Sequence, residues 1–266
     1  MFLATSFRKI IISTLDELSS TRESKWKSLR LFPLKLKDNF LNAFEDYKII
    51  KRYPNLGTGT FHWNGSVSDR EYILSGFNSP RTIISTFVNK DWDWLPVNGK
   101  VVVDIGGYIG DTAIYFISKG ADSVVVYEAF PYSYDKLKNN VIQNNLSGKI
   151  QIHNAIIGSD SEYLVLSPEF ENDNESQVAR SHGSGIKVPA ISLESIAEEI
   201  GSRDAVLKMN CEGCEYKAIL NSAIGTLRVF SHIQMHYHGK LEPLVERLKL
   251  EGFLIEADEY IYATKI

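Results

Sequence analysis

A glycine-rich segment contains the residue types that point most directly to ligand chemistry. Residues 103–112 read Val-Asp-Ile-Gly-Gly-Tyr-Ile-Gly-Asp-Thr, after an apolar run and at the start of a helical pattern. A glycine-rich turn between a strand and a helix is the context in which such a motif binds a cofactor. Glycine is expected there because a Cβ would hold the ligand away from the backbone. We therefore expect Gly106, Gly107 and Gly110 to form a cofactor-binding turn.

The acid that precedes this turn indicates the charge of the ligand. Asp104 lies at the expected carboxyl end of the first strand, where its carboxylate could bind the amino group of a cationic ligand. A dinucleotide carries a negative pyrophosphate, which favours bare amide donors. The GGxxG spacing also differs from the GxGxxG of dinucleotide sites. We therefore expect S-adenosylmethionine as the cofactor, with an NAD-dependent oxidoreductase as an alternative.

A second acid follows at the end of the next predicted strand. Glu128 lies 24 residues after Asp104 (128 − 104), where a carboxylate can accept hydrogen bonds from both hydroxyls of a ribose. Both candidate cofactors contain ribose, so this acid does not distinguish between them. A structural glycine turn beside a solvated Glu128 is the alternative interpretation.

Composition and charge predict a globular protein without a general affinity for polyanions. The 266 residues are 44% hydrophobic and 23% charged, with a formal net charge of −4. This length fits one α/β domain and a smaller added segment. The negative charge argues against a general nucleic-acid binder, although a nucleic-acid methyltransferase stays an alternative because basic residues cluster near the N-terminus. That cluster comprises Arg22, Lys25, Lys27, Arg30, Lys35 and Lys37.

Cysteine content and hydropathy indicate the compartment. The chain has two cysteines, Cys211 and Cys214, unlike the many-cysteine framework of a small secreted domain. It lacks an uninterrupted apolar run of about 18 residues, and its N-terminus lacks the apolar block of a signal peptide. We expect a cytoplasmic protein without a transmembrane segment.

Apolar periodicity predicts the elements that position these residues. Before residue 95 it indicates helices at residues 3–18 and 36–50, a strand at 60–63 that enters a tight Asn64-Gly65 turn, and a helix at 82–88. From residue 100 strands and helices alternate, which is typical of a parallel sheet. The expected strands are residues 101–103, 123–127, 150–157, 205–209 and 229–237, and the expected helices are residues 112–118, 132–144, 193–200 and 241–250. Residues 253–257 and 260–264 are too close for a crossover helix, so we expect an antiparallel hairpin.

Several segments in this order resemble the FkbM-type methyltransferases. They are residues 95–112, 126–131 (Val-Tyr-Glu-Ala-Phe-Pro), 154–158 (Asn-Ala-Ile-Ile-Gly), 188–193 (Val-Pro-Ala-Ile-Ser-Leu) and 207–215, and the resemblance covers about residues 95–253. It implies an S-adenosylmethionine-dependent O-methyltransferase, often acting on sugar or natural-product hydroxyls. It also implies that Asn154 and Ala155 lie near the adenine.

The resulting expectation is an α/β class I methyltransferase fold, a Rossmann-like, mostly parallel sheet with a C-terminal antiparallel hairpin. We expect this domain at residues 95–266 and a mainly helical extension at residues 1–94. The expected cofactor-binding residues are Asp104, Gly106, Gly107, Gly110, Thr112, Glu128, Ala129, Asn154 and Ala155. The expected acceptor is a small molecule or a glycan such as a sugar or glycolipid.

Candidate catalytic residues follow two later strands. Transfer of a methyl group to a hydroxyl needs alignment and a base. The family usually has Asp at the position of Asn210, and an amide cannot take a proton. The family's usual acid is also replaced by His236, so a catalytically inert, cofactor-binding scaffold is an alternative. We expect His238 to be the general base, with Glu212 as its nearest rival.

The cysteines and histidines allow a second interpretation. Cys211, Cys214, His236 and His238 have the ligand types of a tetrahedral zinc site. Packing of the cysteines as small apolar groups is the simpler explanation, and a redox CxxC lacks a thioredoxin-like context. We therefore expect no metal.

Overall fold

The computed structural model describes residues 48–53, 56, 59–65, 67, 70–160, 163–166, 186–201 and 203–266. The predicted helix at residues 3–18 and the basic cluster lie outside the described residues. Of the predicted helix at residues 36–50 the structure describes residues 48–50, which are helical together with residues 51 and 52. The chain divides into two compact units, Met1–Gly59 with Asn78–Arg81, and Thr60–Phe77 with Thr82–Ile266. The expected boundary between residues 94 and 95 stays a prediction.

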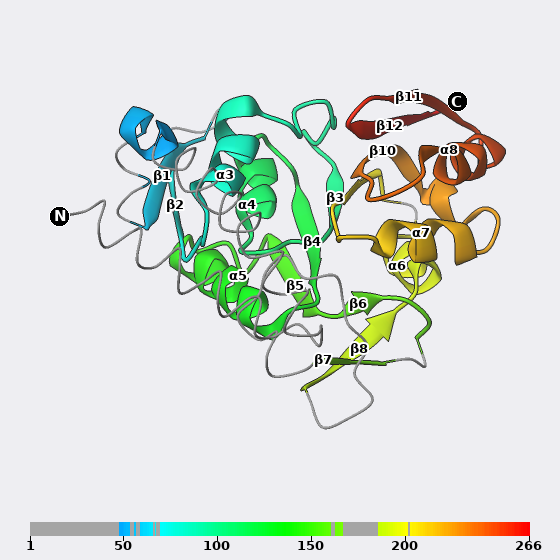
Figure 1. Ribbon diagram of the computed structural model, residues 1–266, viewed down its shortest axis with the longest axis horizontal. Helices are drawn as coiled ribbons and strands as arrows, with labels where there is room; N and C mark the ends of the chain where they lie inside the picture. Colours follow the sequence, from blue (N-terminus) through cyan, green and yellow to red (C-terminus); the bar gives the residue numbers. More distant parts are fainter. Residues whose placement is uncertain are drawn as a thin grey trace, which may run out of the picture. The chain divides into compact units, whose positions relative to one another are not determined.

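A seven-stranded sheet forms the centre of the second unit (Figure 1). In spatial order its strands are β11 (Phe253–Ala257), β12 (Tyr260–Lys265), β10 (Phe230–His236), β9 (Ala205–Met209), β3 (Val101–Ile105), β4 (Ser123–Glu128) and β5 (Ile150–Asn154). The strands from β10 to β5 run parallel, whereas β12 is antiparallel to both β10 and β11. The predicted parallel sheet with a C-terminal antiparallel hairpin is confirmed.

Helices cover both faces of this sheet, which explains why its central strands are continuous apolar runs. The helices are α4 (Asp111–Ser118), α5 (Pro131–Gln143), α6 (Leu193–Ile200), α7 (Cys214–Asn221) and α8 (Leu241–Leu250). On one face Val101, Val103 and Ile105 join a buried cluster with side chains from α6, α7 and α8. Helices α4 and α5 pack against β3, β4 and β5. The alternation of side chains along β3 therefore directs Asp104 away from the first cluster.

Several smaller elements differ from the predictions. The strand predicted at residues 150–157 is divided into β5 and β6 (Ile156–Ile157). Strand β6 leaves the main sheet and pairs in parallel with β8 (Ile186–Ile191), which pairs antiparallel with β7 (Tyr163–Leu166). The prediction missed β7, β8 and α7.

The segment before the main sheet also differs. Strand β1 (Thr60–Asn64) pairs with β2 (Glu71–Ser75), and Asn64 is the partner of Glu71, so residues 65–70 connect the strands and the expected tight Asn64-Gly65 turn is wrong. The helix predicted at residues 82–88 is a short α3 (Pro80–Ile83) continued by the π-helical η2 (Ile84–Asn89). A 3₁₀ turn, η4 (Thr226–Val229), precedes β10. Among the helices described in this chain, none combines the length and apolar character needed to cross a bilayer.

Candidate active site

The glycine turn lies between β3 and α4, as predicted, and two of its glycines are enclosed by protein atoms. A Cβ on Gly106 would lie 1.9 Å from the carbonyl oxygen of Asn210, and a Cβ on Gly107 would lie 2.0 Å from Cγ1 of Val126. Gly106 and Gly110 also adopt positive φ angles of 83° and 85°. We expected a ligand to require these glycines. Packing against β4 and the end of β9 already requires them.

A buried ion pair lies next to the glycine turn and hydrogen-bonds to its backbone. Oδ1 of Asp104 lies 2.7 Å from Nζ of Lys208, and the two side chains are 0% and 1% exposed. The Thr112 hydroxyl donates to Oδ2 of Asp104 at 2.5 Å, and Lys208 Nζ donates to the Gly106 carbonyl at 2.7 Å. The structure therefore brings Asp104 and Thr112 together, and their direct contact with a cofactor stays a prediction. Lys208 was not among the predicted site residues, although a lysine within the apolar run of β9 is a visible signal in the sequence.

Glu128 ends β4 with its carboxylate buried and fixed by two backbone amides. Tyr108 N and Phe130 N donate to it at 2.7 Å and 2.8 Å. Burial, only partly offset by these hydrogen bonds, raises the pKa of Glu128 to about 7. Each carboxylate oxygen has two lone pairs, so each can accept a further hydrogen bond.

The residues that follow β4 and those that end and follow β5 lie side by side. The Asn154 side-chain amide donates to the carbonyls of Glu128 and Ala129 at 2.8 Å and 3.0 Å, and Ala155 N donates to the Glu128 carbonyl at 3.2 Å. Four of the expected cofactor residues are thus gathered at one edge of the sheet.

Buried acids outnumber the cation placed among them. Asp104, Asp111 and Glu128 are all buried near Lys208, whose charge lowers the pKa of Asp111 and Glu128 less than burial raises it. The pKa of Asp111 is raised to about 6, and its carboxylate accepts a hydrogen bond from Thr86 at 2.6 Å. A ligand that brings positive charge or hydroxyl donors would stabilise the ionised acids, whereas a pyrophosphate would meet repulsion. The groups present therefore fit S-adenosylmethionine.

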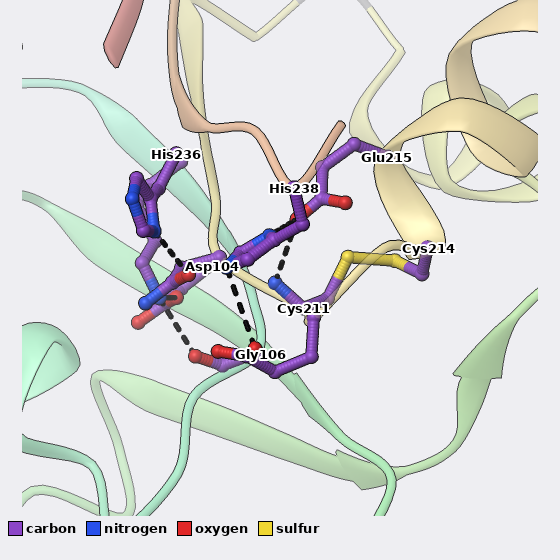
Figure 2. The surroundings of a disulfide bond; sticks show 10 residues. Asp104, Gly106, Cys211, Cys214, Glu215, His236 and His238 are labelled. Atoms are coloured by element: carbon purple, nitrogen blue, oxygen red, sulfur yellow. Dashed lines mark hydrogen bonds and ion pairs between the residues drawn. A yellow bond between two sulfur atoms is a disulfide. The ribbon is translucent and has the colours of Figure 1, made fainter. Parts of the chain in front are cut away.

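A histidine site lies where β9 and β10 end (Figure 2). Nδ1 of His238 is 3.1 Å from Oε1 of Glu215, and its Nε2 is 3.4 Å from Oε2 of Glu212. The hydrogen bond to fully buried Glu215, followed by the charge of Glu212, raises the pKa of His238. Glu215 was not among the predicted site residues, although it is the last residue of the segment 207–215 that contributes to the family resemblance.

His236 and Asn210 border the same site. Nδ1 of His236 lies 3.3 Å from Oδ1 of Asn210, and the two imidazole rings are 4.5 Å apart in an edge-to-face arrangement. Burial, and then the charge on His238, lower the pKa of His236. The three candidate catalytic residues Asn210, Glu212 and His238 thus lie around one point at the carboxyl edge of the sheet, where α/β folds bind ligands.

The two cysteines form a disulfide between Cys211 and Cys214. The expectation that they pack as small apolar thiols is therefore wrong for this state of the protein. In this state their sulfurs bond to each other, so they are not thiolate ligands. Within the described ranges, no group of three or more His, Cys, Asp or Glu side chains could hold a metal ion.

Comparisons with known proteins give one family match. The model of the methyltransferase FkbM domain matches residues 104–254. No curated protein matches the chain.

Solved structures resemble it at low identity. Methyltransferase FkbM from Methylobacillus flagellatus KT is 18% identical over 67% of this chain and 47% of that chain, with a TM-score of 0.46. M. capricolum TrmK, solved with S-adenosyl-homocysteine, is 14% identical over 67% and 66%, with a TM-score of 0.42. A protein of the NADB-Rossmann superfamily from Streptococcus agalactiae is 16% identical over 66% and 64%, with a TM-score of 0.41. The chain thus spans less than two thirds of the length of each of these three.

Proposed function

The chain belongs to the FkbM methyltransferase family, and from this premise we propose that it transfers the methyl group of S-adenosylmethionine to a hydroxyl oxygen. The acceptor class we propose is a sugar, a glycolipid or a small hydroxylated metabolite. The observation that carries the hydroxyl assignment is the pair formed by His238 and buried Glu215 at the carboxyl edge of the sheet. A hydroxyl acceptor needs such a base, because its proton must leave as the methyl group arrives.

The cofactor would lie across the glycine turn. S-adenosylmethionine supplies an electrophilic methyl group to the site. The unused lone pairs of the Glu128 carboxylate would accept hydrogen bonds from the ribose hydroxyls. Ala129, Asn154 and Ala155 would border the adenine. The excess of buried carboxyl groups near Lys208 would balance the positive charge of the cofactor.

The residues after β9 and β10 would handle the acceptor proton. Glu215 accepts from Nδ1–H of His238, which fixes the ring and leaves Nε2 to take the hydroxyl proton. Glu212 lies near the same Nε2 and would stabilise the imidazolium that forms. Asn210, an amide, would orient the acceptor without exchanging a proton.

The decisive experiment measures binding and transfer separately. Calorimetry with S-adenosylmethionine, S-adenosyl-homocysteine and NADH is expected to give binding of the first two only. Labelled cofactor is then incubated with sugars, glycolipids, small hydroxylated metabolites and RNA, and label is expected in a hydroxylated acceptor. Tight NADH binding without a response to S-adenosylmethionine would overturn the cofactor assignment. Cofactor binding without transfer to any acceptor would favour the inert scaffold, and label in RNA alone would favour a nucleic-acid methyltransferase.

Cofactor affinity should depend on the ionisation of Glu128. Its pKa in the free protein is raised to about 7, and ribose hydroxyls that donate to the carboxylate would favour the ionised form. Binding therefore weakens as the pH falls below about 7, by at most about tenfold per pH unit, and levels off above it. Calorimetry between pH 6 and pH 8 checks this slope. In the Glu128→Gln control the affinity should be lower throughout and should lack this slope, and an equal slope in both proteins would contradict the assignment.

A further inference from the structure

The disulfide closes a small ring whose backbone is held in an unusual conformation. Between Cys211 and Cys214 the ring contains only Glu212 and Gly213, and the φ angles of these residues are 54° and 103°. A left-handed conformation costs a non-glycine residue about 1–2 kcal/mol, so the surroundings must hold Glu212 there. The bond between the two cysteines and the hydrogen bond from Cys214 N to the Cys211 carbonyl, 3.3 Å long, both close this turn.

The same turn determines what surrounds the His238 ring. Cys211 N donates to Oε1 of Glu215 at 3.1 Å, and Nδ1 of His238 lies 3.1 Å from that same oxygen. On the other side of the ring, Oε2 of Glu212 is 3.4 Å from Nε2. Figure 2 shows the disulfide beside Glu215 and His238. A change in the turn therefore reaches both nitrogens of the imidazole.

The position of the cysteines favours exchange with an external thiol. Both cysteines are partly exposed, and Cys214 is the first residue of α7. A thiolate at a helix N-terminus is stabilised by the backbone dipoles, so Cys214 is the better leaving group when a thiolate attacks Sγ of Cys211. The second thiol of a dithiol then displaces Cys211 from the mixed disulfide. The dithiol becomes a disulfide, and its two electrons and two protons end on the two cysteine thiols.

We propose that Cys211–Cys214 is a redox site for a dithiol reductant, and that its reduction releases Glu212 from its position at Nε2 of His238. Once the ring is open, Glu212 is free to return to a negative φ, which moves its carboxylate away from Nε2. An effect on turnover rests on the proposed function. The exchange itself and its effect on the His238 ring do not.

The test follows thiols and the His238 ring in the same samples. The intact protein is equilibrated in mixtures of reduced and oxidised dithiothreitol and alkylated for mass spectrometry, and the imidazole resonances are titrated against pH at both redox extremes. We expect two alkylated thiols to appear together, in one two-electron step. We also expect the His238 titration midpoint to move down by about 0.2–0.7 pH units on reduction, as for loss of one partly exposed ion pair. The groups facing this ring are Glu212, Glu215 and His236, so the His236 resonance is followed as well.

His62, which pairs with Glu71 in the β1–β2 hairpin, is the internal control, and its resonances should be the same in the oxidised and reduced samples. The Cys211→Ser/Cys214→Ser variant should match the reduced spectrum and ignore the dithiol, and the wild-type measurement decides alone if this variant does not fold. A disulfide that resists the dithiol in the folded protein would overturn the proposal, as would reduction that leaves His238 unchanged. Neither readout needs turnover, so failure of the proposed function is distinguishable from failure of the redox site.

Discussion

Replacing His238 with alanine is expected to lower kcat by about 10²–10⁴-fold while the affinity for S-adenosylmethionine stays nearly unchanged. The reason is that Nε2 would take the acceptor proton, whereas the cofactor would be held by the glycine turn and Glu128. The measurement is transfer of labelled methyl to the acceptor found in the screen, with calorimetry for the cofactor. An unimpaired His238→Ala enzyme would exclude this residue as the base.

The pH profile separates a base from a structural histidine. Because Glu215 and then Glu212 raise the pKa of His238, kcat should rise with pH to a plateau, with a midpoint above about 6.5. Glu212→Gln should lower that midpoint and keep most of the plateau, since it removes a nearby charge and leaves the hydrogen bond to Glu215. His236→Ala is the matched control and should lower kcat much less than His238→Ala does, because burial disfavours the charged form of His236. Asn210→Asp should retain or increase activity, because it restores the family's usual residue.

The main sheet was predictable because the burial of each strand leaves a pattern in the strand's own sequence. Strands buried on both faces are mostly apolar, so β3, β4 and β9 appear in the sequence as short apolar runs, interrupted by Asp104 in β3 and Lys208 in β9. The hairpin of β11 and β12 followed from the short distance between two such runs. Helix α7 was missed because it buries only Glu215, Ala218 and Ile219 along its length, and its N-cap Gly213 supplies no side-chain cap. The π-helical η2 was missed because helical periodicity does not distinguish its hydrogen-bond pattern from that of an α-helix.

The candidate site was predictable in its positions and not in its partners. Parallel strands bring their carboxyl ends to one edge, so acids and histidines at strand ends could be expected to meet there. The pairing of Asp104 with Lys208 depends on the register between β3 and β9, which is set by tertiary structure and joins residues 104 positions apart. The CxxC spacing likewise fits thiols, a metal site or a disulfide, and does not choose among them.

Lys208→Met should destabilise the protein by about 3–5 kcal/mol, because it leaves the carboxylate of Asp104 buried without its counter-ion. Asp104→Leu alone should lower the unfolding free energy by about as much, because it leaves the ammonium group of Lys208 buried without its counter-ion. Its effect should therefore exceed the loss of one contact to a cofactor. The double variant should cost clearly less than the sum of the two single variants, since apolar side chains can replace a buried pair nearly neutrally. Urea unfolding of the four proteins measures this coupling.

An exposed Lys–Asp pair in the same protein provides the control. The Lys100 and Asp204 side chains are 19% and 61% exposed, so Lys100→Met should change the unfolding free energy by only about 0–1 kcal/mol. Lys208 also donates a hydrogen bond to the Gly106 carbonyl. Lys208→Met should therefore weaken cofactor binding even under conditions in which the variant is folded, whereas Lys100→Met should not. Equal stabilities for the two lysine variants would show that the buried pair does not support the glycine turn. A large difference in stability, with cofactor affinity lost only in Lys208→Met, would mean that the charge beneath the turn holds Gly106 where the cofactor needs it.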